Sequence, residues 1–170
     1  SYVNIGLSRA PYWGGFTNTF TYKGWELYLH TTYSLNYKVY NSVLAEYTSG
    51  TSWTSSNLHK VPSSLKIWEK PGDKADIPMV NADPAFVQEL NHETSFCYTD
   101  ASHLRISNIR LTYNFPQQWM KKICVQSAAL SFSCDNVYTF ASKYFAGMDP
   151  ENVGGWAAPR RFIFGLNVTF

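Results

Sequence analysis

The chain has 170 residues and a formal net charge of +2, and 17% of its residues are aromatic while only 15% are charged. The aromatic content excludes a globally disordered chain, and the weak, scattered positive charge argues against a nucleic-acid partner. No window approaches the roughly 18 consecutive apolar residues of a membrane helix, whereas a membrane barrel stays compatible because its alternating strands average out in hydropathy.

Apolar and polar residues alternate along much of the chain, and this period of two predicts β-strands. The predicted strands cover about 15–23, 25–40, 103–115, 127–140 and 160–170. In the second strand the odd-numbered positions from Trp25 to Tyr37 are mainly apolar and the even-numbered ones polar. Lys23-Gly24, between the first two strands, is a two-residue connection with a glycine, which predicts a tight hairpin.

The segment 42–102 is rich in Ser, Thr, Gly, Pro and Asn, which predicts a long loop. Within it, Asp83-Pro84 followed by 85–90 predicts a short helix, with Asp83 as N-cap and Pro84 at the first helical position. Alternation returns at 103–115, but its phase slips by one residue around Ser107-Asn108, which predicts a β-bulge. The Gly-containing segment 141–159 predicts a second long loop.

Three features favour a membrane barrel over a soluble sandwich. Aromatic residues stand at strand ends, as in the girdles of a barrel, and short connections alternate with long ones. The last residue, Phe170, is aromatic, and we expect the barrel-assembly machinery to read it. Five strands are too few to close a barrel, and an open sheet edge is not tolerated in lipid. The sequence therefore predicts the C-terminal segment of a larger barrel, interrupted within an extracellular loop.

The connection lengths also predict an orientation in the outer membrane. Short turns of such barrels lie in the periplasm and long loops lie outside. With Lys23-Gly24 as a periplasmic turn, 42–102 and 141–159 become extracellular loops. The C-terminus is then periplasmic, and Ser1 lies on the extracellular side.

Four segments, in order over essentially the whole chain, resemble SusC/RagA-type TonB-dependent outer-membrane transporters. They are 14–24, 68–78 with its Trp-x-x-Pro-Gly-Asp motif, 104–116 and 136–170. The resemblance implies an all-β fold, in which these strands are the C-terminal part of a large, roughly 22-stranded transmembrane barrel. The plug domain and the rest of the barrel are not among these residues.

The resemblance also implies a function and partners. The whole transporter would import glycan oligosaccharides or peptides, with a SusD-like surface lipoprotein as lid and the TonB complex as energy source. Its other partners would be the N-terminal part of the same barrel with its plug, the barrel-assembly machinery and outer-membrane lipid.

No catalytic or metal-binding constellation stands out. The four histidines are dispersed, and neither H-E-x-x-H, G-x-S-x-G nor a phosphate-cradling glycine loop is present. The sequence therefore predicts no enzyme activity, no cofactor and no metal site. The three cysteines form neither an even disulfide framework nor a C-x-x-C pair, and we expect isolated apolar side chains.

Candidate recognition residues fall into two groups. The first comprises tryptophans of the predicted outer loops, whose rings could stack on a sugar: Trp53, Trp68 and Trp156. The alternative for these rings is packing between loops or against a lid protein. The second comprises side chains predicted to face the lumen: Glu26, Tyr28, His30 and Arg161. The alternative for this group is contact with the plug, or plain solvation of a polar wall.

A soluble antiparallel sandwich, such as a secreted carbohydrate-binding module, is the competing interpretation. Its sheets would show the same alternation, with the apolar faces packed together instead of facing lipid. The two interpretations differ in one simple property of the isolated chain. A sandwich stays soluble and monomeric without detergent, whereas a barrel segment needs detergent or partner strands.

Overall fold

The computed structural model describes residues 4–48, 61–77, 94–145 and 148–170. The chain forms two compact units. The first, called here the loop unit, consists of Ser1–Pro11, Leu35–His103 and Ala141–Ala157. The second, called the sheet unit, consists of Tyr12–Ser34, Leu104–Phe140 and Ala158–Phe170. The helix predicted at 84–90 lies outside the described residues.

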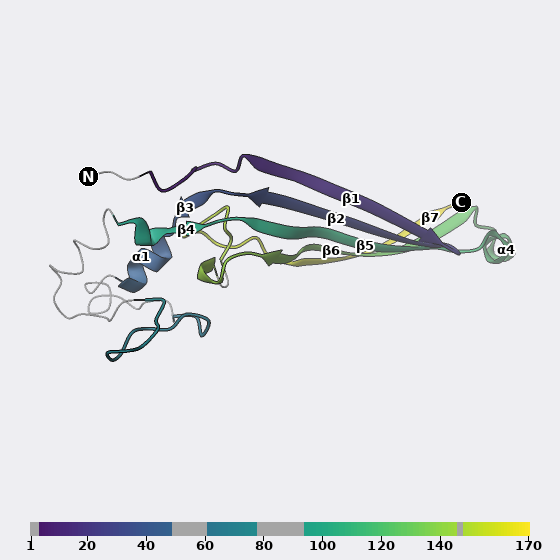
Figure 1. The fold of residues 1–170 in the computed structure, drawn as a ribbon. Helices are drawn as coiled ribbons and strands as arrows, with labels where there is room; N and C mark the ends of the chain where they lie inside the picture. The colour runs from purple at the N-terminus through teal and green to yellow at the C-terminus, as the bar shows by residue number, and fades with distance from the viewer. Residues whose placement is uncertain (1–3, 49–60, 78–93, 146–147) are drawn as a thin grey trace. The chain divides into compact units, whose positions relative to one another are not determined.

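A five-stranded sheet dominates the sheet unit, with its strands in the order β1-β2-β5-β6-β7 (Figure 1). The strands are β1 Tyr12–Tyr22, β2 Trp25–Leu35, β5 His103–Asn114, β6 Ser127–Phe140 and β7 Arg161–Thr169. Both β5 with β6 and β6 with β7 pair antiparallel. Strands thus follow one another across the sheet in chain order, as in an up-and-down meander.

The turn between β1 and β2 is the predicted tight hairpin. Lys23 and Gly24 have φ angles of 46° and 87°, the two positive values that a type I′ turn requires. Gly24 is also pressed against β5, because its carbonyl accepts a hydrogen bond from the Asn114 N–H at 2.8 Å. A Cβ at this position would lie 2.9 Å from the Asn114 carbonyl oxygen. Glycine therefore satisfies both the turn and the close approach.

The phase slip predicted near Ser107 corresponds to a shift in register between β5 and β6. Ile106 pairs with Tyr138, but Asn108 pairs with Asp135, so Ser107 alone faces two residues of β6. The irregularity is confirmed, although the extra residue belongs to β6 rather than to β5. One of its two residues there, Asn136, has a φ of 51°, a left-handed conformation that asparagine tolerates better than most side chains.

The register gives the sheet one apolar and one polar face. Leu111 pairs with Phe132, which in turn pairs with Phe164, and these three side chains make an apolar row across three strands. At the next position of β5, Thr112 pairs with Ser131, and both of these side chains are polar. Phe164 is 78% exposed. The apolar face is therefore uncovered within the sheet unit.

The predicted strand 25–40 is divided in the structure. Strand β2 ends at Leu35, and Asn36 has a φ of 65°. Lys38–Tyr40 is a separate strand, β3, which pairs antiparallel with β4, Tyr98–Asp100. In the sequence, the apolar residues at odd-numbered positions continue past this break to Tyr37, so the alternation does not reveal it. Asn36, a residue type that tolerates the left-handed conformation, is the local sequence feature that marks the break.

The predicted long loop 42–102 contains structure of its own. Its elements in the loop unit are α1 Ser42–Thr48, η1 Ser95–Cys97 and β4, and η3 Lys143–Phe145 follows in 141–157. Val43, Leu44, Leu65 and Ile77 form a buried cluster, against which Val61, Ile67, Tyr144 and Met148 pack. The two long connections of the sheet thus share a small hydrophobic core.

Asn41 directly precedes α1 and is completely buried. Its side-chain oxygen accepts a hydrogen bond from the Leu44 N–H at 2.9 Å, as in an N-cap. Its amide nitrogen donates to the Tyr144 carbonyl at 3.2 Å. One side chain therefore both caps the helix and binds it to the segment that carries η3.

Asn41→Ala should destabilise the loop unit by about 1 to 3 kcal/mol, because it removes a helix cap and leaves the Tyr144 carbonyl without its partner. Hydrogen exchange of the amides in 43–48 measures the effect. Asn167→Ala, at an exposed position of β7, is the control and should change stability by no more than about 0.5 kcal/mol. Unchanged exchange in 43–48 would contradict the role given to Asn41.

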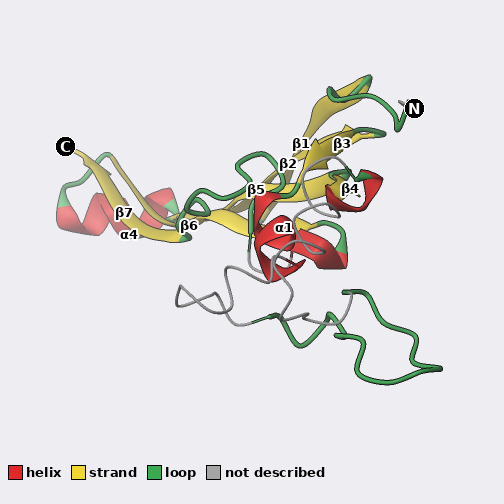
Figure 2. Cartoon of the chain, turned by 90° about the vertical axis from the view of Figure 1, so that its left-hand side faces the viewer, coloured by secondary structure: helices red, strands yellow, loops and turns green. Residues whose placement is uncertain are grey.

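The connection between β5 and β6 consists of α4, Gln117–Met120, and η2, Lys121–Ile123. In Figures 1 and 2 this connection lies beside the C-terminal end of β7. The Gln126 N–H donates to the Thr169 carbonyl at 2.8 Å, which joins the two. The β1–β2 turn is at the same end of the sheet (Figure 1). Within the described part of the chain, no helix is long and apolar enough to cross a membrane.

Candidate functional site

On the polar face, side chains of neighbouring strands contact one another across all five strands of the sheet. His30 of β2 shares a hydrogen bond with Thr17 of β1, with 2.9 Å between His Nδ1 and Thr Oγ1. Thr32 of β2 and Ser107 of β5 have their hydroxyl oxygens 3.1 Å apart. Ser107, the β5 residue opposite the bulge, is therefore on the polar face together with the even-numbered residues of β2.

An aromatic ring and a guanidinium meet on the same face. The Arg110 guanidinium lies 5.0 Å from the centre of the Tyr28 ring, within cation–π distance. The ring is half-buried and Arg110 is exposed. The pair presents a flat, positively charged surface with hydrogen-bond donors that remain open to solvent.

Asp135 is the centre of a third set of contacts on this face. It accepts a hydrogen bond from the Asn108 amide at 2.6 Å and lies 3.5 Å from the Arg161 guanidinium. Because the Arg161 side chain is 71% exposed, solvent screens this ion pair, which therefore contributes little to stability. The hydrogen bond from Asn108 orients the Asp135 carboxylate, and this carboxylate in turn orients the Arg161 guanidinium.

Three of the four predicted lumen residues thus have contacts on the polar face: Tyr28, His30 and Arg161. Glu26 is half-buried, and strand alternation places it on the same face. Sequence reasoning missed Arg110 and Asp135. Alternation could have found Arg110, because the slip at Ser107 moves the polar positions of β5 to the even numbers.

The predicted outer-loop tryptophans are in different surroundings. Trp53 lies outside the described residues. Trp68 is half-buried in the loop unit, where its backbone N–H donates to the Ile77 carbonyl at 2.9 Å. Trp156 is 96% exposed, and its carbonyl accepts from the Asn152 amide at 3.2 Å. Trp156 is therefore free to contact a ligand or partner, whereas Trp68 takes part in the packing of its own segment.

His103 is buried in the loop unit. Its Nδ1 lies 3.0 Å from the Ala101 carbonyl oxygen and 3.4 Å from the Tyr37 hydroxyl, and its Nε2 lies 3.7 Å from a Glu151 carboxylate oxygen. The carbonyl can only accept, so Nδ1 carries the proton of this hydrogen bond. Across the described residues, no three His, Cys, Asp or Glu side chains gather as a metal site.

An ion pair between Lys143 and Asp76 joins two separate segments of the loop unit. The hydrogen bond from Lys143, and after it one from the Lys66 backbone N–H, holds the pKa of the Asp76 carboxyl below its ordinary value. The same hydrogen bond raises the pKa of Lys143. Both pKa shifts favour the charged forms and so favour the contact.

The attachment between these segments should depend on pH. A lowered Asp76 pKa stabilises the folded unit above the ordinary carboxyl pKa, and this contribution is lost as pH falls through the lowered value. For Lys143 the contribution is present below the ordinary lysine pKa and is lost as pH rises through the raised value. Hydrogen exchange of 61–77 should therefore show the contact intact near neutral pH and loosened in acid.

Asp76→Asn is the matched variant for this experiment. It should show at neutral pH the exchange that the native chain shows in acid, with little further change on acidification. An acid-dependent loosening of equal size in the variant would assign the effect to another group.

Comparisons with known proteins extend these observations, although no family model matches the sequence. The chain is 28% identical over 98% of its length to TonB-dependent receptor P39 of Formosa agariphila, and 26% identical over 98% to TonB-dependent receptor P3 of the same organism. It spans only 17% of the length of either relative.

Solved structures of the RagAB peptide importer have the same fold. Against the closed-closed state the TM-score is 0.72 with 20% identity, over 95% of this chain and 17% of that one. Against the open-open state the TM-score is 0.67 with 22% identity, over 96% and 17%.

The two-faced meander is therefore an incomplete part of a larger β-barrel, as the sequence predicted. The resemblance found in the sequence is also confirmed: the chain is similar, over nearly its whole length, to the C-terminal part of TonB-dependent receptors of the SusC/RagA type.

Proposed function

We propose that the chain supplies the C-terminal strands of a TonB-dependent outer-membrane transporter. The observation that carries this proposal is the division of one sheet into an exposed apolar face and a hydrogen-bonded polar face. In a barrel wall the first faces hydrocarbon and the second faces the lumen. The likeness to TonB-dependent receptors and to the RagAB peptide importer supports this assignment.

The sheet edges support a larger assembly. Strands β1 and β7 are the outer members of the five-stranded sheet, so each has one row of backbone groups that no other strand of this sheet pairs. In hydrocarbon every such group must be paired, which requires further strands on both sides. The rest of the same barrel, with its plug, is the proposed source of these strands.

The soluble sandwich is not favoured. A sandwich would cover the apolar face with a second sheet, yet Phe132, Phe164 and Leu166 are all exposed. The buried cluster that the structure does contain belongs to the loop unit. Purified chain that stays monomeric and soluble without detergent would reverse this preference.

The cargo and the other partners follow from the resemblance as part of the proposal. The transporter imports peptides or glycan oligosaccharides, works with a SusD-like lipoprotein and the TonB complex, and has no enzyme activity of its own. The long connections 42–102 and 141–159 are extracellular, with Trp53, Trp68 and Trp156 as candidate ligand or lid contacts. Glu26, Tyr28, His30 and Arg161 face the lumen. The role of Phe170 in barrel assembly stays a prediction.

Uptake by the native host tests the proposal. Deleting the gene of the full-length protein should abolish uptake of a labelled peptide library or of labelled oligosaccharides, and the intact gene should restore it. Uptake should also stop when the TonB gene is deleted. Uptake of both cargo classes at the native rate in the deletion strain would contradict a role in their import.

A further inference from the structure

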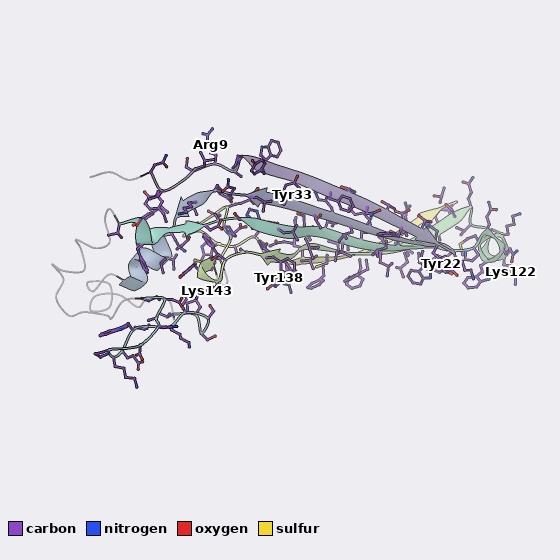
Figure 3. All side chains as sticks on the ribbon, in the orientation of Figure 1. Arg9, Tyr22, Tyr33, Lys122, Tyr138 and Lys143 are labelled. Carbon is purple, nitrogen blue, oxygen red and sulfur yellow. The ribbon has the colours of Figure 1, made fainter. Side chains whose placement is uncertain are left out.

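One end of the sheet combines exposed aromatic and basic side chains. At this end lie the β1–β2 turn, the α4–η2 connection and the end of β7. We use the name basic end for the surface formed here by five side chains: Tyr22, Lys23, Trp119, Lys121 and Lys122. All five are exposed. Figure 3 shows Tyr22 and Lys122 together at this end of the sheet.

The fold holds these groups outward. Met120 of α4 is buried while its neighbour Trp119 is 55% exposed, so the short helix is anchored through one side chain and displays the other. Lys121 and Lys122 occupy η2, which follows directly. In the β1–β2 turn, the Lys23 ammonium lies 5.2 Å from the centre of the ring of its neighbour Tyr22.

The basic end continues into the apolar face of the sheet. The Trp25 and Tyr113 ring centres are 4.6 Å apart, and those of Tyr113 and Phe115 are 5.1 Å apart. Trp25 directly follows the β1–β2 turn and Phe115 lies two residues before α4, so these rings stand between the apolar face and the segments that carry the lysines. This sequence of hydrocarbon-like surface, aromatic rings and ammonium groups matches the boundary between acyl chains and headgroups in a bilayer.

The local charge has one sign. Between Phe115 and Ser127 the connection contains two lysines and no acidic residue. The acidic residue nearest to the turn in sequence is Glu26, and alternation from Trp25 places it on the polar face. Positive charge at a membrane boundary attracts anionic headgroups, and each lysine near the surface contributes.

We propose that the basic end binds anionic phospholipid headgroups of the adjoining leaflet, with the lysines on the phosphates and Trp119 at the acyl boundary. This inference rests on the proposed membrane placement of the sheet, but it adds a preference for charged over zwitterionic lipid. The occupant is a lipid rather than a soluble phosphate because the aromatic rings and the lysines form one continuous surface.

Native mass spectrometry of the full-length protein tests this surface. The protein is taken from nanodiscs of phosphatidylethanolamine mixed with phosphatidylglycerol, and the retained lipids are counted. A variant with K23Q, K121Q and K122Q should lose preference for phosphatidylglycerol by about five-fold for each lysine at low salt, and the native preference should fall as salt rises.

The matched control is K66Q, K70Q and K74Q, which removes the same charge from exposed positions of the loop unit. It should keep the native preference, and both variants should show the heat-dependent gel migration of a folded barrel. Equal preference in native and basic-end variants, equal loss in the control, or displacement of the lipid by soluble glycerol phosphate would each overturn the inference. Protein that stays soluble and never enters nanodiscs would overturn the membrane placement as well.

Discussion

Leu29→Arg should destabilise the assembled barrel by about 2 to 4 kcal/mol, whereas His30→Arg, at the next position, should be tolerated. Leu29 stands near the middle of β2 on the face that carries Trp25 and Leu27. In the proposed orientation an arginine there would place its charge close to the bilayer midplane. His30 is on the opposite face, where its ring already contacts the Thr17 hydroxyl.

The comparison is sharp because both variants introduce the same side chain into the same strand. Unfolding of the full-length protein by urea in lipid vesicles, followed by gel migration with and without heating, measures the difference. The expected result is a lowered urea midpoint for Leu29→Arg alone. Equal loss in both variants would contradict the assigned faces, and so would greater damage from His30→Arg.

Leu44→Ala should destabilise the loop unit by about 2 to 5 kcal/mol while leaving the sheet unit intact. Leu44 is 1% exposed and belongs to the cluster with Val43, Leu65 and Ile77. Removing its branched side chain leaves a cavity where α1 meets 61–77. Since this cluster supplies the buried apolar side chains of that contact, the two segments should separate readily.

Hydrogen exchange resolves the two units in one experiment. In Leu44→Ala, protection should fall in 43–48 and 61–77 but persist in β6, whose hydrogen bonds go to β5 and β7. Leu7→Ala, at an exposed leucine of the same unit, should change little. Loss of protection in β6 together with the loop unit would mean that the two units unfold as one.

Much of the sheet could be predicted because alternation is a direct consequence of strand geometry. The odd-numbered positions of β2 are mainly apolar in the sequence, and so are the even-numbered positions of β6. In the structure the β6 positions continue the apolar face across the sheet, as in the pair of Phe132 with Leu111 of β5. The hairpin could also be predicted from the sequence, because Lys23-Gly24 supplies the two residues of the turn.

The loop unit was harder to predict because its stability comes from contacts between distant segments. Leu44, Leu65 and Ile77 show no periodicity that marks them as one core. Asn41 was not identified from the sequence, and its hydrogen bond to the Tyr144 carbonyl joins residues 103 positions apart. The break at Asn36 was hidden because one left-handed residue does not disturb alternation.

The candidate site was predicted in part for the same reason. Its residues could be assigned to a face from alternation in a single strand, as for Tyr28 and His30. Their partners could not, because the cation over the Tyr28 ring comes from β5, whose facing depends on the bulge. Alternation in β5 could assign Arg110 to the polar face, but its position over the Tyr28 ring follows only from the pairing of β2 with β5.

The register shift also limits how these two strands can change length during evolution. Upstream of it Ile106 faces Tyr138, and downstream Ile109 faces Cys134, so three steps on β5 match four on β6. Deleting one residue from β6 alone would move every β6 side chain beyond the deletion to the opposite face of the sheet. Insertions and deletions here should therefore arise in compensating pairs, or only in the connections beyond the strand ends.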